Sequence, residues 1–150
     1  MIRSIRQQER PVSVIHRFRG DADSWKWEDV PVETIKAGVT GQRFISKRDG
    51  SRNLELRYFE IQPGASSNCE KHNYEHAVLV LRGRGTVVIG ENVFPVQFGD
   101  AIFVEPNEKH QFRANKNEIF GFLCTVLAAA LRPQVLGEQR RVLFDEDICR

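Results

Sequence analysis

A chain of 150 residues with a net charge of +2, 41% hydrophobic residues and 28% charged residues has the composition of an ordinary globular domain. That length buries a hydrophobic core without disulfides or a structural metal, and it predicts a single domain. The nearly balanced charge gives no reason to expect a nucleic acid or a membrane surface as a partner.

The basic N-terminus and the cysteine spacing predict a cytoplasmic protein. The first twenty residues lack the apolar core of a signal peptide, and no stretch reaches the length of a membrane span. The three cysteines, Cys69, Cys124 and Cys149, are odd in number and stand at unrelated spacings. We therefore expect reduced thiols and a fold without disulfides.

Residues 1–37 show weak periodicity and predict an N-terminal arm that packs on the rest of the fold or on a partner subunit. Trp25 and Trp27 stand two apart in this segment. They could stack on a ligand, but paired tryptophans more often attach such an arm to the core or to a partner. His16 lies in a basic stretch of the arm, and we expect it to be exposed.

Residues 38–130 predict an all-β domain. Apolar runs of four to eight residues, rich in Val, Ile, Phe, Leu and Tyr, alternate with breaks that contain Gly, Pro, Asn and Asp. This pattern is typical of many short antiparallel strands, and it favours a sandwich or a small barrel. Residues 131–150 are strongly charged and predict a C-terminal extension, which forms a short helix or lies loosely on the surface.

Three of the four histidines stand close to apolar runs, in two similar contexts. Glu70 and His72 are two apart, so on a strand they project from the same face. His76 opens the next apolar run, and His110 opens a later one. Because the ends of neighbouring antiparallel strands can meet at one mouth of a barrel, these four side chains can converge on one metal ion. Imidazole and carboxylate suit divalent Mn, Fe, Ni, Cu or Zn. Alternatively, the four residues are no more than surface, capping or solvated turn residues.

Two sequence motifs in this region resemble those of the cupin superfamily. The first motif has a glycine, a pair of ligands separated by one residue, a third ligand and a closing glycine. Here "PGASSNCEKHNYEHAVLVLRG" supplies Gly64, Glu70, His72, His76 and Gly83. The resemblance extends over about residues 40–127, and it implies a cupin-type antiparallel β-barrel, also called a double-stranded β-helix or jelly roll.

The second motif, "GDAIFVEPNEKH", begins at Gly99 and ends at the ligand position His110. Asn107 replaces the usual glycine of its turn, and asparagine tolerates positive φ better than most residues. In the first motif, Glu70 replaces the usual histidine and His76 replaces the usual glutamate. The resemblance therefore implies a centre of three histidines and one carboxylate in a rearranged order. Glu70 either binds the metal or stands free beside it as a base.

Several other residues are candidates for the pocket or for chemistry. Arg57 could anchor a substrate carboxylate or lie on the surface. Phe112 shares the face of His110 and could line the pocket, whereas Phe122 is either pocket or core. We expect Glu75 to point outward. We expect Cys69 to point away from the metal, which leaves a Cys-x-x-His zinc site as a minority alternative.

The resemblance implies an enzyme whose metal acts on a small organic substrate at the barrel mouth, as a dioxygenase, an isomerase, or a lyase or decarboxylase. The alternatives are a non-catalytic cupin that binds or senses a small ligand, and a subunit whose metal is only structural. No helix-turn-helix pattern is present, so a DNA-binding regulator is not expected. The resemblance also implies a homodimer.

Overall fold

The computed structural model describes residues 13–133 and 141–149, and it confirms the all-β prediction. The strands, in chain order, are β1 (Glu33–Lys36), β2 (Val39–Ile45), β3 (Leu54–Ile61), β4 (Cys69–His72), β5 (His76–Arg82), β6 (Arg84–Ile89), β7 (Asn92–Gln97), β8 (Ala101–Val104), β9 (His110–Ala114), β10 (Phe120–Leu127) and β11 (Arg141–Phe144). Three short 3₁₀ turns accompany them: η1 (Lys47–Asp49), η2 (Ala129–Leu131) and η3 (Glu146–Cys149). Within these ranges, no helix is long and apolar enough to cross a membrane.

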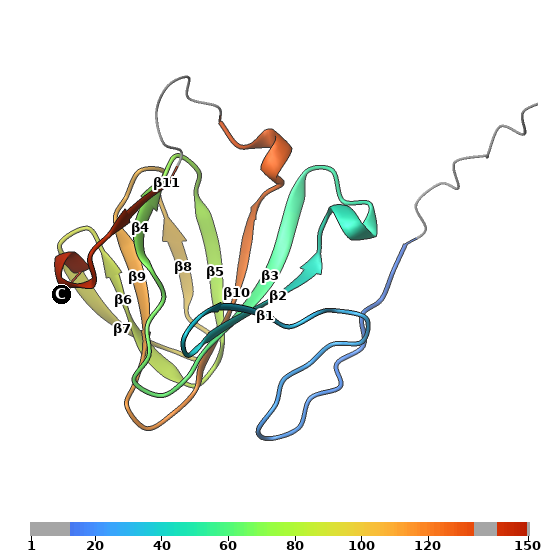
Figure 1. The fold of residues 1–150 in the computed structure, drawn as a ribbon, viewed down its shortest axis with the longest axis horizontal. Helices are drawn as coiled ribbons and strands as arrows, with labels where there is room; N and C mark the ends of the chain where they lie inside the picture. The colour runs from blue at the N-terminus through green and yellow to red at the C-terminus, as the bar shows by residue number, and fades with distance from the viewer. Residues whose placement is uncertain (1–12, 134–140, 150) are drawn as a thin grey trace, which may run out of the picture.

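The strands form two antiparallel sheets that lie face to face (Figure 1). One sheet has the order β1-β2-β3-β10-β5-β8, and the other has the order β11-β4-β9-β6-β7. The sheets are separate hydrogen-bonded units, so the cupin-type fold is realised as a jelly roll rather than as a closed barrel. The main core fills the space between them, with Ile61, Val80, Val87, Val104 and Phe120 almost fully buried.

Residues 13–32 lie beside β2 and β3 (Figure 1). Trp25 and Trp27 attach this segment to the outer face of these strands. The Trp25 ring stacks on Tyr58 with centroids 5.7 Å apart, and the Trp27 ring lies 4.2 Å from Phe44. Both tryptophans therefore pack a terminal segment onto the chain's own fold. His16 is not exposed as expected: its side chain is only 7% accessible, because its Nε2 atom lies 2.7 Å from a carboxylate oxygen of Asp49.

The expectation of a fold without disulfides was wrong, because Cys69 is bonded to Cys149. The last strand, β11, pairs antiparallel with β4 and places Phe144 opposite Cys69. The η3 turn then brings Cys149 back to the same position, across 80 residues of sequence. Cys124 is buried and free. The expectation of a cytoplasmic protein relied in part on reduced thiols, and the disulfide removes that support.

Candidate metal centre

The two sheets bring Glu70, His72, His76 and His110 to one place. Glu70 and His72 come from β4, His110 comes from the neighbouring strand β9, and His76 comes from β5 in the opposite sheet. The β4–β9 register pairs Glu70 directly with His110. One ligand atom from each of the four residues lies within 4.8 Å of the others. The two motifs, about forty residues apart in the sequence, thus meet at one end of the jelly roll.

Hydrogen bonds at the Nδ1 atoms orient the imidazole rings. His72 Nδ1 donates to the carbonyl oxygen of Tyr74 at 2.7 Å, and His110 Nδ1 donates to that of Glu108 at 2.9 Å. His76 Nδ1 lies 3.1 Å from the thiol of Cys124. Nδ1 partners of this kind leave Nε2 as the ligating atom and raise its basicity. All three rings therefore present Nε2 to a common centre.

The Nε2 atoms of the three histidines are not satisfied in the usual way: among the described residues, one has no hydrogen-bond partner and the other two contact each other. His110 Nε2 is buried and has no hydrogen-bond partner among the described residues. His72 Nε2 and His76 Nε2 lie only 2.7 Å apart, which places two lone pairs against each other unless a cation or a proton lies between them. Buried polar atoms without partners are rare in proteins and point to an ion. The donor set fits a divalent transition metal.

Glu70 differs from the three histidines in its surroundings. One of its carboxylate oxygens lies 3.8 Å from His110 Nε2, while the other forms an ion pair with Arg141 on β11. The carboxylate can thus face the centre and remain bound to the C-terminal strand. Glu75 is exposed, as expected, and takes no part in the cluster.

Burial keeps the histidines neutral at physiological pH. Desolvation, together with the neighbouring histidines, lowers the pKa of His72 to about 4 and that of His76 to about 2. Desolvation also lowers the pKa of His110, although Glu108 and Glu70 oppose the shift. A neutral imidazole is the form that binds metal, so the site needs no deprotonation at pH 7.

We expect the metal-free protein to lose stability as the pH falls from about 6.5 toward 4. The unfolded chain protonates its histidines near pH 6.5, whereas folded His72 resists protonation until about pH 4, so the stabilisation is complete above pH 6.5 and declines below it. His72 alone accounts for of order 3 kcal/mol over this window. Thermal unfolding of chelator-treated protein between pH 7.5 and 4.5 measures the slope, and His72→Gln should make it less steep, while His76 and His110 still contribute. An equally steep slope in His72→Gln would refute this assignment.

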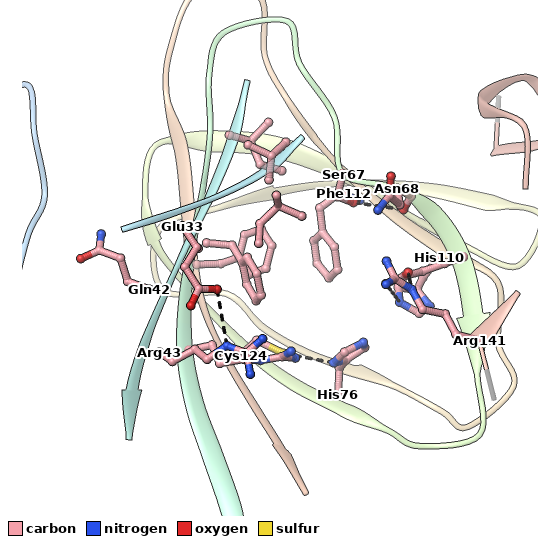
Figure 2. Close-up of a pocket in the computed structure, with 18 of the residues that line it drawn as sticks. Glu33, Gln42, Arg43, Ser67, Asn68, His76, His110, Phe112, Cys124 and Arg141 are labelled. Atoms are coloured by element: carbon pink, nitrogen blue, oxygen red, sulfur yellow. Dashed lines mark hydrogen bonds and ion pairs between the residues drawn. The ribbon is translucent and has the colours of Figure 1, made fainter. Parts of the chain in front are cut away.

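A cavity of about 190 Å³ opens beside the histidines between the two sheets. Figure 2 shows His76 and His110 on one side of it and Glu33 and Arg43 on the other. Its apolar lining consists of Ile35, Val39, Phe59, Ile61, Phe112 and Phe122. The structure thus places the candidates Phe112 and Phe122 in the lining, where their rings stack with centroids 4.4 Å apart.

Apart from Glu70, the charged lining includes one residue that sequence reasoning named and several that it missed. Arg57 lines the cavity, as the sequence allowed, together with Arg43 and Arg141. Tyr74 stacks on the His72 ring at 3.8 Å. The only sequence signal that Cys124 lines the cavity was the strand face that it shares with Phe122. No sequence signal pointed to Arg141, because its position depends on how β11 pairs.

Comparisons with known proteins agree with this geometry. A family model described as a cupin domain matches residues 57–126. The chain is 43% identical, over 87% of its length and 86% of the relative's, to a 1-methylthio-D-xylulose 5-phosphate methylsulfurylase from Rhodospirillum rubrum.

Solved structures show the same similarity. A cupin-2 domain protein from Rhodospirillum rubrum is 32% identical, with a TM-score of 0.69 over 87% of this chain and 85% of that one. A cupin 2 conserved barrel domain protein from Rhodopseudomonas palustris is 36% identical, with a TM-score of 0.65 over 81% of each chain.

Proposed function

The chain belongs to the cupin superfamily, and from this premise we propose that it is a metal-dependent enzyme that acts on a methylthio-substituted pentulose phosphate. The convergence of three Nε2 atoms and one carboxylate within 4.8 Å of one another, at the wall of a small pocket, carries the proposal. The 43% identity to the methylsulfurylase supports this substrate class.

Each part of the pocket suits a part of such a molecule. The stacked aromatic rings of Phe112 and Phe122 offer an apolar surface for a methylthio group. The cavity volume of about 190 Å³ admits a small organic substrate and excludes a polymer. The guanidinium groups of Arg43 and Arg57 suit a phosphate group.

His72, His76 and His110 would hold the metal, with Glu70 beside it. A bound divalent ion supplies Lewis-acid polarisation of a substrate oxygen and a template for its orientation. The protein's own contribution is to keep three imidazoles neutral, to aim them through their Nδ1 partners and to exclude water with the aromatic wall.

The test is turnover of 1-methylthio-D-xylulose 5-phosphate by protein reconstituted separately with Mn, Fe, Ni, Cu or Zn. We expect consumption of this substrate with at least one metal, and loss of that activity in His72→Ala. A protein that binds the substrate but leaves it unchanged with every metal would be a non-catalytic binding cupin, and the enzyme proposal would be wrong.

We also propose that the protein is a homodimer. Leu79 on β5 and Phe103 on β8 remain 40% and 57% exposed on the outer face of the larger sheet, and β8 is its edge strand. Exposed apolar side chains beside a sheet edge favour association with a second chain. Sedimentation of a single monomeric species at micromolar concentration would contradict this.

A further inference from the structure

Arg57 occupies an unusual position on the inner face of the larger sheet. It lies on β3, directly opposite Arg43 on β2 and opposite Cys124 on β10. Cys124 in turn contacts His76, so Arg57 is separated from the metal-binding histidines by one side chain. Its guanidinium lies over the Phe59 ring, 5.0 Å from the centroid, which supports the flat face of the group.

The Arg57 guanidinium has no anionic partner among the described residues. Its Nε atom is buried without a hydrogen-bond partner, and the contact of its Nη2 is the sulfur of Cys124 at 3.4 Å, a weak acceptor. Arg57 is half-buried, and holding a charge partly out of water without a counterion is unfavourable unless a ligand supplies the opposite charge. The unsatisfied guanidinium therefore marks a place for an anion.

Arg43 adds a second positive charge to the same place. Like charges directly opposite on neighbouring strands are destabilising. The carboxylates of Glu33 and Glu55 approach Arg43, but both lie at 3.7 Å, beyond hydrogen-bond distance. The described residues that line the cavity include three arginines and two glutamates, so the lining has an excess of positive charge. A bound divalent metal would add two more positive charges.

We propose that Arg57, assisted by Arg43, binds a tetrahedral oxyanion, the phosphate group of the substrate. The naming of a substrate phosphate rests on the proposed function, but the anion site itself rests only on the unpaired guanidinium. This assignment gives the substrate a direction in the pocket. The phosphate lies at the β2–β3 wall, and the opposite end of the molecule reaches the histidines.

Inorganic phosphate is the probe, and chelator-treated protein is used so that phosphate cannot bind through a metal. We expect calorimetry to show saturable binding by the wild type, and about tenfold weaker binding by Arg57→Met, because one charge-assisted fork is lost. Arg57→Lys keeps the positive charge but loses the paired N–H donors of the guanidinium, so its affinity for phosphate should lie between those of the wild type and Arg57→Met. Arg84→Met is the matched control, since Arg84 is an exposed arginine on β6 that pairs with Glu118; it should bind like the wild type.

A second measurement separates ligand binding from a structural role. If Arg57 lacks an anionic partner, Arg57→Met should melt at a higher temperature than the wild type in phosphate-free buffer, and phosphate should stabilise the wild type more than it stabilises Arg57→Met. Absence of phosphate binding by the wild type, or equal binding by Arg57→Met, would overturn the anion site. Phosphate binding that depends on Arg57 in a protein without turnover would instead reject the proposed function and leave the anion site standing.

Discussion

Replacing His110 with alanine should lower the affinity for a divalent metal about 100-fold while leaving the fold intact. Structural zinc sites bind with about 10–16 kcal/mol, or roughly 3 kcal/mol for each of four ligands, and 3 kcal/mol corresponds to about 100-fold. Among the candidate ligands, His110 Nε2 is the buried nitrogen without a hydrogen-bond partner in the described residues, so the substitution deletes a metal donor and loses the hydrogen bond from Nδ1 to Glu108. Competition with a fluorescent chelator measures the affinity.

His16→Ala is the matched control, because His16 binds Asp49 outside the centre. It should retain the metal with unchanged affinity. If His16→Ala and His110→Ala lose the metal equally, the loss reflects damage to the fold. If neither loses it, the four residues do not form the centre.

Glu70→Gln addresses whether the carboxylate is a ligand or a base. One oxygen of Glu70 is occupied by Arg141 and the other lies 3.8 Å from His110 Nε2, so the carboxylate is less committed to the centre than the imidazoles. We expect a loss of metal affinity of about tenfold, smaller than that in His110→Ala. Undiminished metal affinity together with lost turnover would make Glu70 a base and remove it from the ligand set.

The parts of the structure that could be predicted from sequence are those in which local spacing determines geometry. The alternation of apolar runs and turn residues gave the all-β class, and the two motifs indicated the superfamily. Asn107 was expected to take a positive φ, and its φ is 65°. Glu70, His72 and His76 lie within seven residues, so strand periodicity alone limits where they can point.

The parts that escaped prediction depend on pairings between distant segments. Nothing in the spacing of Cys69 and Cys149 indicates a bond, because their approach requires β11 to pair with β4. Arg141 reaches Glu70 through the same pairing. The sequence placed Arg57 on one face of a strand, but it could not show that Arg57 lacks an anionic partner. That depends on Arg43 of β2 and Cys124 of β10, which lie beside it.

The disulfide should contribute of order 4 kcal/mol to the free energy of unfolding. It closes a loop across 80 residues, and in the chain-entropy model the stabilisation grows slowly with loop length. Cys149→Ser should therefore lower the melting temperature by about 10 °C for a chain of this size. Calorimetry of the oxidised protein measures the difference.

Reduction of the wild type provides the control for this variant. Dithiothreitol should bring the wild type to the melting temperature of Cys149→Ser and leave the variant unchanged, because the variant has no bond to reduce. Hydrogen bonds from Lys109 to Ile148 and from Arg113 to Cys149 still hold the η3 turn, so the loss should be partial rather than complete unfolding. If thiol counting confirms that the buried bond is reduced and the melting temperature of the wild type is unchanged, the bond adds no stability. Since β11 carries Arg141 to Glu70, faster amide exchange in β11 after reduction should accompany release of that ion pair, linking the cysteine pair to the metal centre.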